Sequence, residues 1–169
     1  MTKAEQKNAR DAHQILTILA WGAVAILGIN ISYFVGEEVG AMWFESRGDW
    51  MQVFNAWWVG ILKAMPTILI AWAIAEFAIL FGRCSEGNVL TPQNVKTLKS
   101  GADSLIWAAI WSALITPNVL SWIGGEYQGL SFSFRDLALA VGMMGFVMHG
   151  LAVVFEDAIA VKAENDEFV

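Results

Sequence analysis

Three ionisable side chains lie inside long apolar stretches of the sequence: Lys63, Glu76 and His149. A charged residue at the centre of a membrane-spanning helix costs about 2.5–3.5 kcal/mol on insertion scales, so an ionisable residue there is a candidate for function. A histidine beside a carboxylate can gain and lose a proton near physiological pH, which is chemistry that Glu76 and His149 could support together. Any site that these residues form must be held by the helices that carry them.

Glu76 and His149 are predicted to interact, directly or through a water molecule. Glu76 lies six residues before Gly82 and His149 six before Phe155, so two helices that run in the same direction would hold them at about the same depth. Rows of small residues accompany both positions, and small residues let helices approach closely in lipid. The pair would either fix the register of two helices or act as a proton site, and both interpretations stay open.

Lys63 is expected near the outer end of its apolar stretch. Its long stem can snorkel to the membrane surface and anchor the helix there. Alternatively it can reach polar residues expected at a similar depth, namely Glu37, Glu38, Asn30 and Asn118. Pro66 follows three residues later and is expected to kink the helix.

No recognisable catalytic or metal-binding pattern accompanies these residues. The chain has no HExxH motif, no glycine-rich phosphate loop and a single cysteine, Cys84. Its net charge of −6 provides no basic stripe to bind nucleic acid. We therefore expect no metal, no cofactor, no direct nucleic-acid partner and no enzymatic activity.

The apolar stretches themselves predict an all-α protein that crosses a membrane four times. They cover residues 15–35, 57–81, 105–123 and 137–155, each close to the ~20 residues that a helix needs to cross a bilayer. The chain is 57% apolar and 15% charged, against about 45–50% and about 25% in soluble domains. We expect residues 1–169 to form one integral membrane domain, a bundle of four transmembrane helices.

Basic residues are distributed unevenly over the parts of the chain between these spans. Seven lie in the two tails and the middle connection, and two, Arg47 and Arg135, lie in the other connections. Because Lys and Arg are enriched on the cytoplasmic side of membrane proteins, both termini and the middle connection are expected in the cytoplasm.

The three connections carry separate predictions. Residues 36–56 are acidic and aromatic, and we expect an outer loop that lies as a lid in the headgroup region or binds a ligand. Residues 130–134 alternate apolar and polar, which favours a short extended segment that pairs with that loop. In the middle connection, Thr91 and Pro92 predict a helix start. The helix that follows is amphipathic and is expected on the inner leaflet or the underside of the bundle.

The cytoplasmic face is the expected interaction surface, because it combines this amphipathic helix with an acidic tail. Its candidate residues are Thr91, Asn94, Lys96, Lys99, Glu164, Asn165, Asp166 and Val169. The tail ends in two apolar residues, so it could dock against Lys96 and Lys99 of the protein itself or in a groove of a partner.

Two stretches at this face carry a family resemblance. Residues 81–101 read FGRCSEGNVLTPQNVKTLKSG and residues 155–169 read FEDAIAVKAENDEFV. Together with the span layout they resemble a bacterial family of small four-span membrane proteins, domain of unknown function 2975. The resemblance implies a protein of the bacterial inner (plasma) membrane that partners a small helix-turn-helix regulator. It implies no activity and no functional residues.

The leading hypothesis is a non-enzymatic regulatory or sensory membrane protein. Its cytoplasmic face would bind a soluble partner such as a small helix-turn-helix regulator, and its outer loops or buried polar groups would receive the input. The alternative is a small transporter or channel component in which Glu76, His149 and Lys63 line a path. Such a carrier would need to form a homo-oligomer, because four short helices enclose little volume. Membrane lipid is the remaining expected partner.

Overall fold

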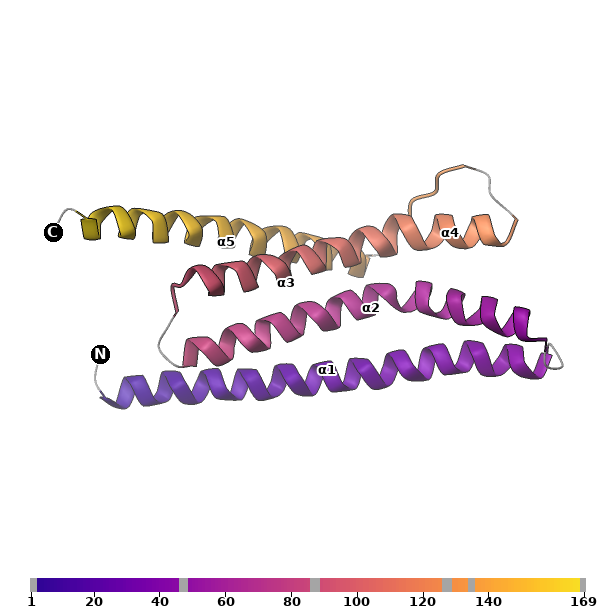
Figure 1. Ribbon diagram of the computed structural model, residues 1–169, viewed down its shortest axis with the longest axis horizontal. Helices are drawn as coiled ribbons and strands as arrows, with labels where there is room; N and C mark the ends of the chain where they lie inside the picture. Colours follow the sequence, from indigo (N-terminus) through magenta and orange to yellow (C-terminus); the bar gives the residue numbers. More distant parts are fainter. Residues whose placement is uncertain (1–2, 46–48, 86–88, 126–128, 134–135, 168–169) are drawn as a thin grey trace.

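The described residues of the protein are almost entirely helical (Figure 1). The computed structural model describes residues 3–45, 49–85, 89–125, 129–133 and 136–167. The helices are α1 (Lys3–Glu45), α2 (Trp50–Ser85), α3 (Pro92–Ile110), the π-helical turn η1 (Trp111–Ile115), α4 (Thr116–Ile123) and α5 (Asp136–Glu167). Because α3, η1 and α4 follow one another without a break, they form one rod, and the fold consists of four rods.

All four rods are long and apolar enough to cross a membrane. The qualifying segments are Asp11–Glu45, Trp50–Ser85, Pro92–Ile123 and Asp136–Asn165. Each exceeds the ~20 residues that a bilayer requires, so each helix extends past its apolar stretch with polar turns. The predicted all-α architecture with four spans is confirmed, and the chain fits an integral membrane protein.

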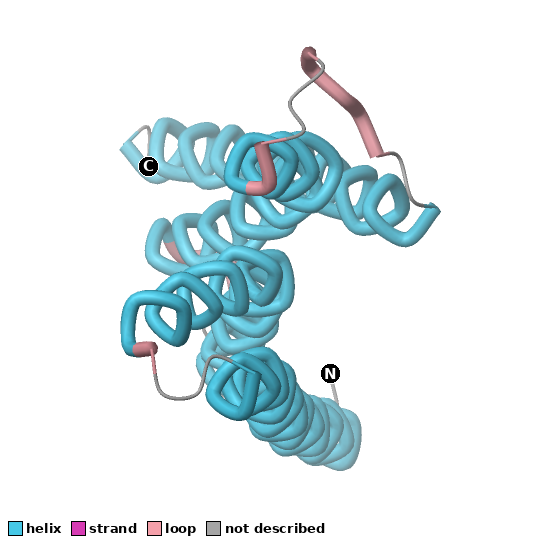
Figure 2. The backbone as a smooth tube through the Cα atoms, turned by 90° about the vertical axis from the view of Figure 1, so that its right-hand side faces the viewer, coloured by secondary structure: helices cyan, strands magenta, loops and turns pink. Residues whose placement is uncertain are grey.

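The rods pack in chain order. α1 packs against α2, α2 against α3, and α3 against α5. Seen along the rods, they follow one another rather than close into a ring (Figure 2). Both termini and the connection between α2 and α3 lie at one end of the molecule, here called the N/C end, and the opposite end is called the far end (Figure 1).

Small residues bring α5 close to α3. A Cβ atom added to Gly145 would lie 2.8 Å from Cγ1 of Ile106 and 2.9 Å from the carbonyl oxygen of Ala102. A Cβ atom at Gly142 would lie 2.9 Å from Cβ of Ala109. The small-residue face of α5 therefore serves close helix packing, as expected in lipid, and the helix that it meets is α3.

The first connection is much shorter than predicted. α1 continues to Glu45 and α2 begins at Trp50, so most of the expected outer loop over residues 36–56 is helical and the prediction of a lid is wrong. Polar residues alone do not end a helix where it leaves the hydrocarbon, so α1 continues. Asp49 caps the start of α2, because its carboxylate accepts a hydrogen bond from the N–H of Met51 at 3.0 Å.

The start of α3 is confirmed, but its surroundings differ from the prediction. The side chain of Thr91 caps the helix by accepting from the N–H of Asn94 at 3.2 Å, and Pro92 occupies the first turn. The apolar face of α3 is buried between α2 and α5, with Val95 and Leu98 in a core with Ala152. This amphipathic helix therefore belongs to the bundle and does not lie on its underside, because α5 covers the face that would have met lipid.

Candidate functional site

Two prolines interrupt the helices in the far-end half of the molecule. Pro66 has no N–H, so it cannot donate to the carbonyl of Leu62 one turn earlier. That carbonyl accepts instead from the indole N–H of Trp111, at 3.2 Å. Figure 1 shows α2 bending part-way along its length, in keeping with the kink expected at Pro66.

The α3–η1–α4 rod, which faces α2, also has a carbonyl group that accepts from a replacement donor. Pro117 cannot donate to the carbonyl of Ala113, and that carbonyl accepts from the N–H of Ser133 at 2.9 Å. Directly before it lies the π-helical turn, in which the N–H of Thr116 reaches back to the carbonyl of Trp111. Such turns are uncommon and are often found at functional sites.

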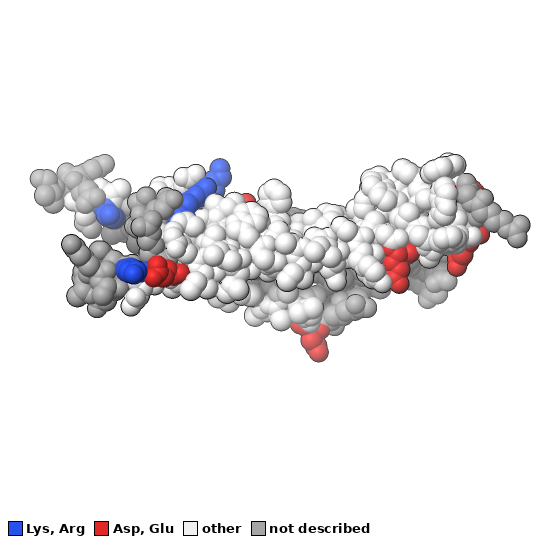
Figure 3. All heavy atoms as spheres, turned by 90° about the horizontal axis from the view of Figure 1, so that it is seen from below, with Lys and Arg blue, Asp and Glu red and all other residues white. Residues whose placement is uncertain are grey.

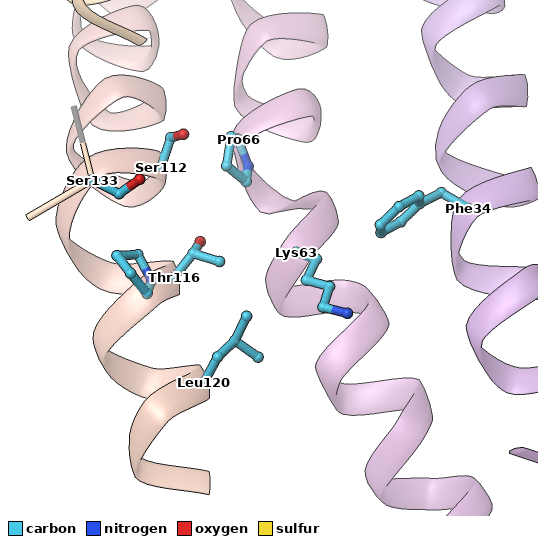
Figure 4. Close-up of a pocket in the computed structure, with 8 residues that line it drawn as sticks. Phe34, Lys63, Pro66, Ser112, Thr116, Leu120 and Ser133 are labelled. Atoms are coloured by element: carbon cyan, nitrogen blue, oxygen red, sulfur yellow. The ribbon is translucent and has the colours of Figure 1, made fainter. Parts of the chain in front are cut away.

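A cavity of about 380 Å³ lies between these two irregular stretches. We call it the far-end cavity; Figure 4 shows α1, α2 and the α3–η1–α4 rod around it. It is lined by Phe34, Lys63, Pro66, Ser112, Thr116, Pro117, Leu120 and Ser133. One lysine, three hydroxyls and several apolar side chains therefore surround the same space.

Lys63 makes an ion pair beside this cavity. Its Nζ donates to Oε1 of Glu38 at 2.7 Å, and each side chain is about one-third exposed, at 32% and 33%. The carboxylate comes from α1 and places a negative charge against the Lys63 amine within an otherwise apolar helix. Of the polar neighbours that the sequence suggested for Lys63, Glu38 is the one that it contacts.

Two of the other three residues expected near Lys63, Asn30 and Asn118, have separate roles. Asn30 lines a smaller adjoining cavity together with Phe34 and Thr67. The side-chain amide of Asn118 holds the connection after α4: it donates to the carbonyl of Ser131 at 2.7 Å and accepts from the N–H of Ser131 at 2.8 Å. The non-helical segment 130–133 therefore returns along the rod, and its described hydrogen bonds do not go to the first connection as predicted.

Glu76 and His149 do not form the predicted direct pair. Ser100 donates to Oε1 of Glu76 at 3.2 Å, whereas Nδ1 of His149 lies 2.7 Å from Oδ1 of Asp103. Because α3 lies between α2 and α5, each residue meets α3 first. Their partners are one turn apart on α3, so the two residues lie at a similar depth. An interaction between them through a water molecule stays a prediction.

Asp103 and Ser100 are the polar partners that the sequence analysis missed. Both precede the apolar stretch 105–123, so the apolar pattern does not mark them as part of a span. A usable signal was available: between Pro92 and Asp103 no further proline occurs and Gly101 is the single glycine, so one helix can continue through this stretch. A single continuous helix places Asp103 one turn from the span.

A groove lies between α3 and α5 at the N/C end. Its volume is about 510 Å³, and we call it the N/C-end groove; it is lined by Pro92, Val95, Lys96, Lys99, Glu156, Ile159 and Ala160. Nζ of Lys99 lies 3.7 Å from Oε2 of Glu156, and both side chains are well exposed. This ion pair contributes little stability, because exposed pairs are worth about 0–1 kcal/mol.

The predicted interaction surface is only partly assembled at this groove. Lys96 and Lys99 line it, whereas Asn94 is buried and donates to the carbonyl of Val89 at 3.1 Å, so its placement on the surface is wrong. The end of α2 packs against this side of α3, where Arg83 donates a hydrogen bond to the hydroxyl of Thr97 at 2.9 Å.

The acidic tail continues α5 as a helix up to Glu167. Glu164 and Asn165 are exposed, while the side chain of Asp166 and all of Val169 lie outside the described residues. The carboxylate that contacts Lys99 belongs to Glu156, which lies well before the tail. Docking of the tail itself therefore stays a prediction.

Charge is distributed unevenly along the molecule. On the face seen in Figure 3, Lys and Arg gather toward the N/C end, whereas Asp and Glu lie toward both ends and near the middle. Arg47 and Arg135, the two basic residues expected at the other surface, lie outside the described residues.

Residues 48–169 match the model of a family described as "Protein of unknown function (DUF2975)". The match includes both stretches that carried the resemblance, residues 81–101 and 155–169. It begins just before α2, so Lys63 lies within the matched region and Glu38 lies before it. No curated protein and no solved structure matches the chain.

Proposed function

Because the chain belongs to the DUF2975 family, whose function is unknown, we propose a function from the geometry: it is a non-enzymatic regulatory membrane protein that binds a soluble protein in the N/C-end groove. The observation that carries the proposal is the groove itself, about 510 Å³ between α3 and α5. A groove between two helices is a common docking place for a third helix.

The chemistry of the groove favours an amphipathic helix with acidic residues. Val95 and Ile159 provide apolar contacts, and Lys96 is exposed, with no ion-pair partner among the described residues. Within the described ranges, Lys99 has one ion-pair contact, a long and exposed one with Glu156, which a partner carboxylate can replace at small cost. Complementary charge of this kind speeds association and selects the partner.

We further propose that the groove faces the cytoplasm of a bacterial cell, with the protein in the inner membrane. Both termini lie at the groove's end of the molecule, and the basic residues gather there (Figure 3). Positive charge marks the cytoplasmic side of membrane proteins. A soluble transcription regulator, such as a small helix-turn-helix protein, would meet the groove in that compartment.

The sensory part of the proposal relies on the α3–η1–α4 rod. This rod lines the N/C-end groove with Lys96 and Lys99 and the far-end cavity with Ser112 and Thr116. A change at the cavity that shifts the π-helical turn would alter how α3 presents its groove residues. We propose that the far-end cavity receives the input and the groove delivers the output.

A transporter that uses Glu76, His149 and Lys63 receives less support. Glu76 contacts α3 from α2 and His149 contacts it from α5, and neither side chain lines the far-end cavity with Lys63. A third cavity, which shares Pro66 and Ser112 with the far-end cavity, is lined largely by apolar residues, including Ile70, Ala109 and Val141. These contacts and this lining give no support for a polar path that Glu76, His149 and Lys63 share.

Photo-cross-linking in native membranes tests the proposed partner. A photo-cross-linking amino acid at Ala160, which lines the groove and is exposed, should trap one soluble protein, and the same amino acid at exposed Ala158 should trap much less. Lys96→Glu should lower the yield of that product about fivefold or more, since it places like charge opposite the partner. Lys162→Glu, the matched charge reversal outside the groove lining, should leave it unchanged.

Two results would contradict the proposal. One is a product whose yield falls equally in the Lys96→Glu and Lys162→Glu variants, because the groove would then have no special role. The other is no soluble product at Ala160, which would make solute flux through the membrane the better hypothesis. A truncation after Val161 in the same assay shows whether Glu164 and Asn165 take part in the surface.

A further inference from the structure

We infer that the far-end cavity binds an anionic amphiphile, a molecule with one carboxylate or phosphate group and an apolar tail. The inference names the chemistry of the input that the proposed function assigns to this cavity, but binding there can be tested whether or not the N/C-end groove has a partner. It rests on a cation with free donors, hydroxyl groups on the opposite wall of the cavity, apolar side chains in the lining and a backbone that is irregular around the space.

Lys63 supplies the charge that would recognise the anionic group. An ammonium group has three N–H donors, and Glu38 is the one partner of Lys63 among the described residues. Both side chains remain about one-third exposed. A ligand oxyanion can therefore reach the ammonium group without first displacing Glu38. The ligand and the Glu38 carboxylate would then share the positive charge of Lys63.

Hydroxyl groups stand on the other side of the same cavity. Ser112 and Thr116 come from the α3–η1–α4 rod, and Ser133 comes from the segment that returns along it (Figure 4). The Oγ1 atom of Thr116 is buried and has no hydrogen-bond partner among the described residues. Buried hydroxyls are normally hydrogen-bonded, so an oxygen atom of a ligand would supply the hydrogen-bond partner that the Thr116 hydroxyl lacks.

The remaining lining suits the first part of an apolar tail. Phe34, Pro66 and Leu120 provide apolar walls (Figure 4). A volume of about 380 Å³ lies within the ~300–1,000 Å³ of small-molecule sites. Figure 4 shows α1 and the α3–η1–α4 rod on opposite sides of α2, so we place an opening of the cavity on the side between them that faces away from α2. A tail can leave through that side into the bilayer.

The backbone around the cavity is irregular on both walls. Pro66 interrupts α2, and the π-helical turn with Pro117 interrupts the facing rod. Irregular backbone at membrane depth is tolerated where it is buried in protein or lines a cavity. Trp111 and Ser133 satisfy the carbonyls that the prolines leave open, so the shape of the space is held by tertiary hydrogen bonds.

The test uses a diazirine-bearing C12 fatty acid, an amphiphile with a carboxylate, added to the full-length protein in a neutral maltoside detergent. Its neutral methyl ester is the chemical control. After irradiation, mass spectrometry should find the label on residues that line the cavity, among them Phe34 and Leu120, and the ester should label them about tenfold less, since it lacks the charge-assisted hydrogen bond.

Variants separate recognition by charge from a structural role. Lys63→Met should lower labelling about tenfold or more, and Lys63→Arg should largely retain it. Glu38→Gln removes the ion pair but leaves the cation, so labelling should stay equal or rise because a competing carboxylate is gone. Lys99→Met, at the N/C end, should have no effect.

Competition distinguishes two sources of the same chemistry. In nanodiscs, replacing phosphatidylcholine with phosphatidylglycerol should reduce labelling if the natural ligand is a membrane phospholipid, and should leave it unchanged if the site selects a carboxylate from solution; both results agree with the inference. Equal labelling by acid and ester overturns it. So does a loss in Glu38→Gln as large as in Lys63→Met, which would show that the ion pair only holds α1 against α2.

Discussion

The two halves of the α3–η1–α4 rod are built in different ways. In α3 the helix is regular and capped, and eight of its residues are buried, among them Leu98, Ala102 and Leu105. In η1 and α4 none is buried, and a π-helical turn and Pro117 interrupt the hydrogen bonds. One half is organised for close packing between α2 and α5, and the other leaves the far-end cavity beside it.

This contrast shows how a single helix can serve two purposes. Packing requires small residues at fixed positions, because neighbouring backbones nearly touch. A cavity requires that neighbouring helices stay apart. Its shape then depends on hydrogen bonds from distant residues, which replace the backbone hydrogen bonds lost at the prolines. Substitutions in the packed half should therefore lower stability most, and those in the irregular half should act mainly on the cavity.

Gly145→Ala should be the most damaging substitution in the packed half. The new Cβ would lie 2.8 Å from Ile106 and 2.9 Å from the carbonyl oxygen of Ala102, and overpacking of this kind costs about 1–3 kcal/mol. Thermal unfolding in detergent measures the loss. Gly150→Ala is the matched control on the same helix, since its Cβ would meet nothing within 4 Å. Equal stability of the two variants would contradict the described α3–α5 packing.

Trp111→Phe tests the irregular half. It removes the indole N–H that donates to the carbonyl of Leu62, and an unsatisfied buried carbonyl costs about 1–3 kcal/mol. Because Trp111 is partly exposed, we expect the lower part of this range, together with weaker labelling of the far-end cavity. Trp107→Phe, an exposed tryptophan on the same rod, is the control. Retained stability and labelling in Trp111→Phe would mean that this bond does not hold the cavity.

Thr91→Ala should cost about 1 kcal/mol, the usual loss of a helix N-cap. The hydroxyl accepts from the N–H of Asn94 at 3.2 Å, and Thr91→Ser keeps that acceptor, so it should be nearly neutral. Chemical or thermal unfolding of both variants measures the difference. A Ser variant as unstable as the Ala variant would indicate that the methyl group of Thr91, rather than its oxygen, matters.

Lys99→Met should have the smallest effect on stability, about 0.5 kcal/mol or less. Its contact with Glu156 is long, at 3.7 Å, and exposed. The same unfolding assay applies, with Lys63→Met for comparison, because the 2.7 Å pair with Glu38 should contribute more. A larger loss of stability in Lys99→Met than in Lys63→Met would contradict the expectation that the Lys63–Glu38 ion pair contributes more than the Lys99–Glu156 ion pair.

The sequence was sufficient for features that depend on local chemistry. Four apolar stretches of spanning length gave four helices, since helix is the form in which a single segment satisfies its backbone in lipid. Thr91 and Pro92 marked the start of α3, because an N-cap acts within its own first turn. The likeness to DUF2975 likewise rested on contiguous residues, and the family match extends over both stretches.

The sequence was insufficient where contacts depend on the order of helices in space. Glu76 and His149 had matching depth, but depth does not reveal that α3 lies between them and offers Ser100 and Asp103 instead. The first connection was misjudged for a different reason: polar and aromatic residues past the membrane surface still continue a helix. The π-helical turn has no sequence signal beyond the neighbouring Pro117.

The central claim is that the two ends of the α3–η1–α4 rod serve opposite sides of the membrane. Thiol labelling of intact cells tests it most directly, in a background with Cys84→Ala. Phe44→Cys, exposed at the far-end terminus of α1, should react with a membrane-impermeant maleimide in intact cells. Lys96→Cys, in the N/C-end groove, should react only after the cells are permeabilised. Labelling of Lys96→Cys in intact cells would contradict the account, because the groove could then not meet a cytoplasmic partner.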